Sequence, residues 1–384
     1  MPATRAGMPP WIRGRYKMKA YSAALFSAGL LVALAGPGLV KAQGSTAAVQ
    51  PHLDKAKEAA WRPKDGLNDL TKLYETVCEP ALSAKGPAVD QEPGPPEKHR
   101  TPPRSDWYQD PAKVFDNLYW LGSWGSASRV PSKGDISPAG NSTWAVTTSE
   151  GIILIDSGMD YTAPTLIGEN MKKAGLDPTQ IKYLILTHAH SDRYWGAKFV
   201  QDTYHAHLIT SETDWQGIEK SPDPDDIKPK KDMVATDGQK LTLGDTTLTI
   251  YSTPGHSPGT ISVLVPLKDG NEKHLGAVWG GINANLYGHG IRNGPTLADV
   301  DKMWIASATR FIEIANKAGV DTYLTIHPFY DNAIEKIHLL QYRKPGDPNI
   351  MVSKENFNRF MTIIKECTEA ELARIPSSHG ATGQ

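Results

Sequence analysis

The chain has 384 residues, enough for one large domain with additional segments. Its charge is nearly balanced, with 41 Lys and Arg residues against 42 Asp and Glu residues and a formal net charge of -1. This balance argues against nucleic-acid binding, which needs a basic surface.

Residues 1–42 have the composition of a secretory signal peptide. Basic residues between positions 13 and 19 precede an apolar stretch at 20–40, and small residues at the −3 and −1 positions favour cleavage after Ala42. Met18 is an alternative start. A Gly-Pro-Gly sequence makes the apolar stretch a poor lasting membrane helix, although an uncleaved anchor is the alternative. We therefore expect a periplasmic or secreted protein with no stable membrane span after cleavage.

Residues 43–106 are expected to form a helical extension followed by a linker. Leucines at 67, 70 and 73 recur at helical spacing, whereas residues 84–104 are rich in Pro, Gly and charge and favour a surface tether. The two cysteines are Cys78 and Cys367. An oxidising compartment permits a disulfide between them, but the sequence leaves their pairing open.

The compact domain is expected at residues 107–384. Its elements, in chain order, are a strand at 114–121, a hairpin at 143–148 and 151–156, a helix at 164–174, a strand at 183–186, a helix at 192–204, hairpin-like pairs at 241–252 and at 261–265 with 275–279, a helix ended by Gly319, a strand through Ile326, and a final helix capped by Ser353. Hairpins with intervening helices indicate an α/β fold, namely an αββα sandwich of two sheets with helices outside.

Three candidate metal ligands lie directly after the expected strand at 183–186. His188, His190 and Asp192 occupy alternate positions there. Alternate side chains of an extended segment point the same way, so these three can converge beyond the strand end. Imidazole and carboxylate are ligands that zinc prefers.

Two further histidines stand in matching settings. His256 lies in the sequence Thr-Pro-Gly-His-Ser-Pro-Gly-Thr, and His327 precedes a proline at the end of a strand-like run. Each therefore lies where Gly or Pro turns the chain at a strand end. Three strand ends that each deliver a ligand are a way for an α/β scaffold to build a metal site.

This order of motifs resembles the metallo-β-lactamase superfamily, most closely the subclass B3-like periplasmic metallo-hydrolases, over residues 113–345. Further matches lie at 151–158 and 237–244. The resemblance implies the metallo-β-lactamase fold, a first zinc site made by three imidazoles, and a second metal site. The implied first-site ligands are His188, His190 and His256, and the implied second-site ligands are Asp192 and His327.

The chain departs from the family pattern at two places. Arg193 stands where the family usually has a histidine ligand of the second metal, and an arginine has no lone pair to donate. Residues 280–282, Gly-Gly-Ile, offer no coordinating side chain where many members have a bridging aspartate. We therefore expect one firmly held zinc and a second site that is weak, empty or rebuilt. His289 is an alternative ligand from a neighbouring loop.

The sequence thus predicts a zinc-dependent hydrolase that acts on a small carbonyl substrate, either a β-lactam, a lactone or an ester. Asp192 is expected to orient the water nucleophile and shuttle its proton, and Asp156 to support the metal ligands. Arg193 is expected to steady an anionic oxygen, or alternatively to pair with Asp192. The alternative function is a non-catalytic, degenerate zinc-binding member of the superfamily. The substrate, the metal count and the oligomeric state stay open.

Overall fold

The computed structural model describes residues 46–61, 66–82, 101–124, 126–127, 136–137, 140–284 and 295–375. The expected signal peptide, most of the expected linker and His289 lie outside these ranges. Within the ranges, no helix combines the length and the apolar character that a membrane crossing needs.

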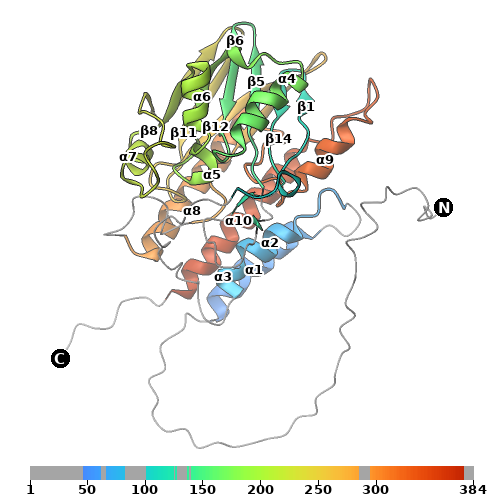
Figure 1. Cartoon of the computed structure of the whole chain (residues 1–384). Coiled ribbons are helices and arrows are strands. Elements are labelled where there is room, and N and C mark those ends of the chain that lie inside the picture. Colours follow the sequence, from blue (N-terminus) through green and yellow to red (C-terminus); the bar gives the residue numbers. More distant parts are fainter. Residues whose placement is uncertain are drawn as a thin grey trace, which may run out of the picture. The chain divides into compact units, whose positions relative to one another are not determined.

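Two β-sheets form the middle of the described structure (Figure 1). The first contains, in spatial order, β1 (Ala112–Phe115), β2 (Leu118–Trp120), β5 (Trp144–Thr148), β6 (Gly151–Ile155), β7 (Ile181–Ile185), β8 (His207–Ser211) and β9 (Met233–Ala235). The second contains β10 (Gln239–Leu243), β11 (Thr246–Ser252), β12 (Ile261–Asp269), β13 (Glu272–Val278) and β14 (Thr322–Tyr323). A separate ribbon pairs β3 (Ser126–Ala127) with β4 (Ile136–Ser137).

Strand β6 shows why the two sheets pack face to face. Ile153 and Ile155 belong to a core that also contains second-sheet residues such as Val263. Ile152 and Leu154 belong instead to a core shared with the helices outside the first sheet. Successive side chains of a strand point to opposite faces, so a strand that is apolar throughout is buried on both sides. The predicted αββα sandwich is therefore confirmed.

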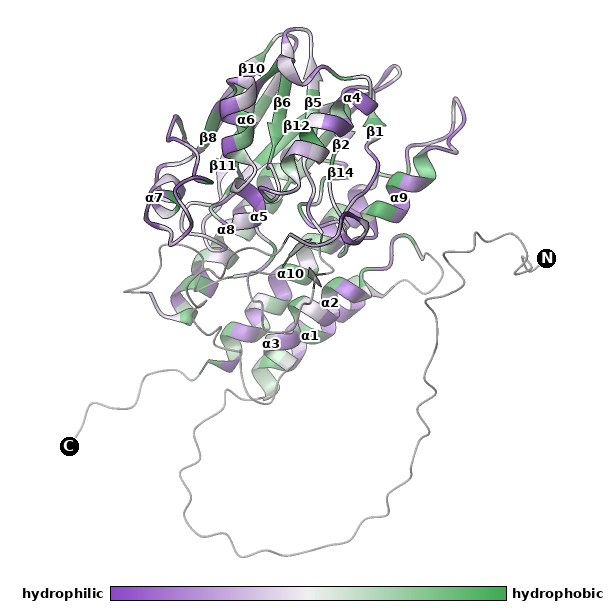
Figure 2. Cartoon of the chain, in the orientation of Figure 1, coloured by the Kyte–Doolittle hydropathy of each residue, from purple (hydrophilic) through white to green (hydrophobic). Residues whose placement is uncertain are grey.

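Helices cover the outer faces of both sheets, and the hydrophobic colours of Figure 2 concentrate on the strands between them. On the first sheet they are a π-helical segment (Pro164–Glu169) that runs into α4 (Asn170–Lys173), then α5 (Ser191–Tyr194), α6 (Ala197–Tyr204) and α7 (Glu212–Lys220). On the second sheet they are α8 (Leu297–Ala318) and α10 (Lys354–Arg374), with α9 (Ala333–Leu340) beside β1. Short 3-10 turns lie at Arg104–Asp106 and Pro178–Gln180.

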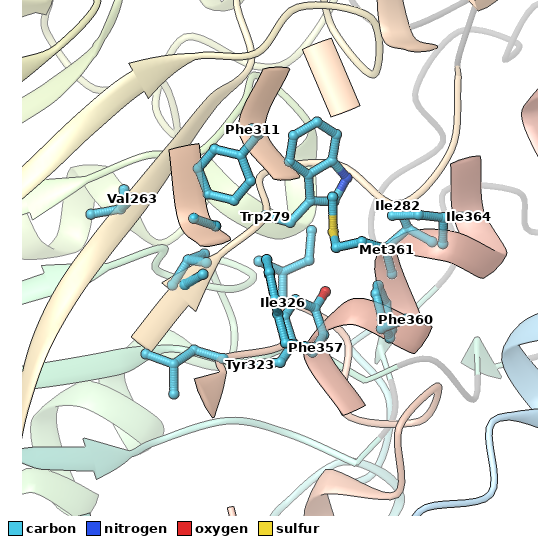
Figure 3. Packing of buried hydrophobic residues seen from close by; sticks show 14 of the residues in the cluster. Val263, Trp279, Ile282, Phe311, Tyr323, Ile326, Phe357, Phe360, Met361 and Ile364 are labelled. Atoms are coloured by element: carbon cyan, nitrogen blue, oxygen red, sulfur yellow. The ribbon is translucent and has the colours of Figure 1, made fainter. Parts of the chain in front are cut away.

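Aromatic packing between the second sheet and helices α8 and α10 holds the end of β13. The ring of Trp279 lies 5.4 Å from that of Phe311 and 5.5 Å from that of Trp304. Figure 3 shows Met361 of α10 reaching the same cluster, with Ile282 beside it. The loop that follows β13 therefore starts from a rigid base.

The N-terminal extension packs on the C-terminal helix. Its helices are α1 (Thr46–Ala60), α2 (Thr71–Val77) and α3 (Glu79–Leu82), and all three contact α10. Leu53 and Leu73 are buried in the same core as the second sheet. A disulfide joins Cys78 to Cys367, so the extension is also tied covalently to α10.

The structure corrects two of the expected strands. The strand expected at 114–121 is a hairpin of β1 and β2, because the chain turns at Asn117, whose side chain bonds the backbone of β12 at Pro266 and Lys268. The strand expected through Ile326 ends at Tyr323. The carbonyl of Ile326 accepts a hydrogen bond from the backbone N–H of Ser142, which lies outside that sheet.

Candidate metal centre

Three histidine rings from two separate loops meet at the strand ends. His188 and His190 follow β7, and His256 lies between β11 and β12. The ring of His188 has its centroid 4.5 Å from those of His190 and His256, and the last two are 4.7 Å apart. One nitrogen from each ring lies within 4.8 Å of the other two. The structure thus brings together the three imidazoles assigned from the sequence to the first metal site.

Hydrogen bonds orient the ring of His188. Thr187 Oγ1 donates to the Asp156 carboxylate at 2.9 Å and therefore accepts from His188 Nδ1 at 3.1 Å. A proton on Nδ1 leaves Nε2 with its lone pair free. This Nε2 is buried and has no hydrogen-bond partner among the described residues, which is costly unless something binds it. The Nε2 of His188 is therefore suited to bind a metal. Asp156 influences this ring only indirectly, through its hydrogen bond with Thr187.

His256 is held in a similar way from the loop after β13. Its Nδ1 lies 2.8 Å from the carbonyl oxygen of Asn283, which can only accept, so Nδ1 carries the proton and Nε2 has the lone pair. The ring also lies against Gly281, where an added Cβ would stand 2.1 Å from the His256 Cβ. The absence of a side chain at Gly281, identified from the sequence as a missing ligand, is therefore what makes room for His256.

Burial keeps these imidazoles neutral. It lowers the pKa of His188 well below its ordinary value, aided by the neighbouring His190, and it lowers the pKa of His256 to about 4. Metal binding requires the neutral ring, so this environment favours the ligand form at neutral pH.

Asp214 connects the two ligand loops, and sequence reasoning missed it. Its carboxylate accepts from the backbone N–H of Ala189 at 3.0 Å, from Ser257 Oγ at 2.6 Å and from the N–H of Gly259 at 2.9 Å. Ala189 lies between the first two histidines, and Ser257 follows His256. One carboxylate from α7 therefore sets the spacing between the loops. Its sequence context, an ordinary acidic helix start, gives no signal of this role.

Arg193 lies at the position where the family resemblance implied a second metal. Its side chain is 0% exposed. The two terminal nitrogens of the guanidinium donate to four protein groups, namely the carboxylates of Asp192 and Asp156, the Asn141 side chain at 2.8 Å and the Ile326 carbonyl at 3.0 Å. The guanidinium is enclosed by these groups, and its pairing with Asp192 matches the alternative named from the sequence. The expected role of Arg193 in steadying an anionic oxygen stays a prediction.

His327 belongs to the surroundings of Arg193. Its Nδ1 lies 2.7 Å from the carbonyl oxygen of Gly140, which places the ring proton there. Its Nε2 lies 3.3 Å from Arg193 Nη2 and 3.7 Å from Asp192 Oδ2. The group of histidines close enough to share one ion does not include His327. Burial lowers the pKa of His327 to about 4.

Asp192 lies between the guanidinium and solvent. Its side chain is 21% exposed, and its Oδ2 is 2.5 Å from Arg193 Nη2. Burial by itself would raise the pKa of this carboxyl, but the charge of Arg193 outweighs that effect and holds the pKa far below its ordinary value. Asp192 is therefore ionised at any neutral pH.

A second set of potential ligand atoms, on α1 and α10, serves packing. His52 Nδ1 lies 2.7 Å from Glu366 Oε2 and 3.1 Å from Glu369 Oε2, and Lys55 pairs with Glu366. The positive charge of Lys55 balances the carboxylate of Glu366, so no metal ion is needed there. This cluster joins the extension to the C-terminal helix.

Comparison with known proteins agrees with this geometry. Residues 137–269 match the model of the metallo-beta-lactamase superfamily. A probable metallo-hydrolase of Bacillus subtilis, YybB, is 28% identical over 123 residues, which cover 31% of this chain and 54% of that protein. The chain thus aligns with about half the length of this curated relative.

Solved structures with the same fold include subclass B3 metallo-beta-lactamases. The enzyme BJP-1 of Bradyrhizobium japonicum is 26% identical with a TM-score of 0.55, and the match covers 67% of this chain and 91% of that one. FEZ-1 of Legionella gormanii is 22% identical, with a TM-score of 0.52 and coverages of 66% and 91%, and shows the fold alone. A Cronobacter sakazakii metallo-beta-lactamase with a HARLDQ motif is 25% identical, with a TM-score of 0.52 and coverages of 67% and 95%.

Proposed function

Since this chain carries a metallo-beta-lactamase superfamily domain, we propose that it is a zinc-dependent hydrolase that works with a single tightly bound zinc. The observation that carries the proposal is the convergence of His188, His190 and His256 around one point, with the Nε2 of His188 buried and unpartnered among the described residues. Three protein ligands that leave one position open are the usual arrangement of a catalytic zinc.

The three imidazoles would hold the zinc, and the rest of the site would serve the reaction. When bound, zinc supplies a Lewis acid that polarises a carbonyl and lowers the pKa of water to about 7. Asp192 is a partly exposed carboxylate whose charge acts on His256, and it would accept a hydrogen bond that orients water toward the substrate. A carboxylate of strongly lowered pKa is a weak base, so Asp192 orients the water more than it stores its proton.

The positive charge of Arg193 stands in place of the charge that a second metal ion would supply. Arg193 balances the buried charges of Asp156 and Asp192 and has no lone pair with which to bind a metal. It acts through Asp192, whose carboxylate it fixes in place, and is therefore a positioning residue. His327 Nε2 lies against the same guanidinium nitrogen that pairs with Asp192.

The substrate we propose is a small carbonyl compound, either a β-lactam, a lactone or an ester, processed outside the cytoplasm. The signal-like residues 1–42 support export. The disulfide between Cys78 and Cys367 supports an oxidising compartment, where such bonds persist.

Metal analysis and a substrate panel test the proposal together. Zinc-loaded protein should contain one tightly held equivalent and hydrolyse at least one of nitrocefin, a homoserine lactone and a nitrophenyl ester. His188→Ala and His256→Ala should lose both zinc and turnover. His207→Ala is the matched control, because His207 is exposed and pairs with Asp232, and it should keep both. Two tightly bound equivalents would overturn the single-zinc proposal.

The enclosed guanidinium of Arg193 also favours a second candidate, a non-catalytic zinc-binding protein. Asp192→Asn separates the two. A hydrolase should lose most of its turnover while it keeps its fold and its zinc, since the carboxylate orients water. Full zinc loading without turnover of any panel substrate would favour the non-catalytic function.

A further inference from the structure

A cavity of about 90 Å³ lies between the N-terminal extension and the C-terminal helix. Thr76 of α2 forms one wall, and Thr368 and Glu371 of α10 form another. The loops that follow β13 and β14 contribute Asn283 and Tyr330, and the apolar side chains of Val77 and Ile282 complete the lining. The cavity is thus built by segments from both ends of the described chain.

This cavity adjoins the metal centre. The carbonyl of Asn283, which lines it, accepts the hydrogen bond that orients His256. The ring of Tyr330, which also lines it, lies 6.0 Å from the ring of His327. The negative charge of Asp192 adds to burial in raising the pKa of Tyr330, as expected for a neighbour. The cavity and the metal centre therefore share Asn283, and Tyr330 places the cavity close to His327 as well.

The lining mixes polar and apolar side chains, and its one carboxyl group is that of Glu371. No Lys or Arg is among the described lining residues. Burial raises the pKa of Glu371 to about 7. Behind it, Asp301 of α8 is fully buried, and neither of its carboxyl oxygens has a hydrogen-bond partner among the described residues. A half-buried carboxyl with no Lys or Arg among the described lining residues attracts a positively charged group when it is ionised.

The disulfide fixes this wall in place. Cys78 follows α2 directly after the lining residues of that helix, and Cys367 precedes Thr368. Because the bond joins the two sides of the cavity next to their lining residues, their separation depends on it. The helical extension is therefore a wall of this cavity.

Resting on the proposed hydrolase function, we propose that this cavity is a substrate subsite for a protonated amine, with the carboxylate of Glu371 as its acceptor. The substrate class is an acyl compound whose acyl chain ends in an ammonium group. An acyl chain that ends in a carboxylate is disfavoured where Glu371 is ionised, because two carboxylates repel each other.

A pair of matched esters tests the subsite above neutral pH, where Glu371 is ionised and an alkyl amine stays protonated. The zinc-loaded protein should hydrolyse nitrophenyl 6-aminohexanoate with a kcat/KM about tenfold above that for nitrophenyl heptanoate, a difference of about 1.4 kcal/mol. Glu371→Gln should abolish this preference by slowing only the amino ester. Glu369→Gln, a change on the same helix at a residue that pairs with Lys365, is the control and should keep the preference.

A binding measurement separates this inference from the hydrolase function. 6-Aminohexanol has no scissile bond, and it should raise the melting temperature of wild type but not of Glu371→Gln. Glu371-dependent binding without hydrolysis of any ester, nitrocefin or homoserine lactone would refute the hydrolase and keep the subsite. Hydrolysis of both esters at equal rates, with no such binding, would refute the subsite and keep the hydrolase.

Discussion

Arg193 Nη2 lies 2.5 Å from Asp192 Oδ2, and the guanidinium is fully enclosed while the carboxylate is partly exposed. A permanent cation from the chain itself thus neutralises a carboxylate that the family resemblance assigned to a second metal. Since an arginine cannot exchange or dissociate, the charge balance of this part of the site does not depend on metal supply.

Arg193→His should convert the protein from one bound zinc to two. A histidine there offers a lone pair beside Asp192 and His327, which makes three protein ligands. The metal-free variant should melt below wild type, because the buried carboxylate of Asp156 loses its ion pair, and loss of one partner of such a pair costs about 3–5 kcal/mol. Excess zinc should restore part of that stability.

Metal analysis and thermal melts with and without zinc measure both effects. Arg193→Lys keeps the charge without offering a neutral nitrogen, so it is the control and should still bind one zinc. A histidine variant that binds one equivalent would show that His327 and Asp192 do not form a latent second site.

Asp214→Asn should weaken zinc binding by about 10–100-fold, the usual effect of losing a group that orients metal ligands. The amide keeps the size of the carboxylate but turns an NH₂ toward backbone donors, so the loops bearing His190 and His256 lose their common acceptor. Competition with a chromophoric chelator measures the affinity. Asp232→Asn is the control, because Asp232 accepts from the N–H of Leu208 away from the metal loops. Equal zinc affinity in both variants would contradict the role assigned to Asp214.

Gly281→Ala should displace His256 and reduce zinc occupancy, because the new Cβ would stand 2.1 Å and 2.3 Å from two atoms of that residue. Both zinc content and turnover should fall while the fold persists by circular dichroism. Gly66→Ala is the control, since a Cβ at Gly66 meets nothing within 4 Å. Full zinc occupancy in the Gly281 variant would mean that the ring can shift without cost.

The sequence predicted the sandwich because strand periodicity and turn residues act locally, as β5 and β6 show. It also singled out the three histidines that converge, because His188 and His190 occupy alternate positions after one strand and His256 stands beside turn-forming Gly and Pro residues. Asp214 escaped prediction because its three donors come from segments far from α7 in the sequence. For Arg193 the sequence identified an unusual charge, but its enclosure depends on partners such as Asn141, which only the folded chain brings close.

Asp301→Asn should stabilise the protein at alkaline pH and leave it nearly unchanged at acidic pH. Burial, together with the charge of Glu371, raises the pKa of Asp301 from 3.8 to about 8. Between these values the folded state holds a proton that the unfolded chain releases, so the free energy of unfolding falls as pH rises from about 4 to about 8. An asparagine cannot ionise and avoids this cost. We expect a gain on the order of 1–3 kcal/mol above pH 8, after allowance for relaxation around the charge.

Thermal melts of wild type and variant across this pH range, without ligand, measure the effect. Asp245→Asn is the matched control, because Asp245 is an exposed carboxylate whose pKa is lowered to about 2 by Lys268. That variant should gain nothing at alkaline pH, since its carboxylate is already favoured in the folded state. If Asp301→Asn shifted the melting temperature equally at acidic and alkaline pH, the effect would come from packing, and the carboxyl would not be the proton-binding group inferred from its burial.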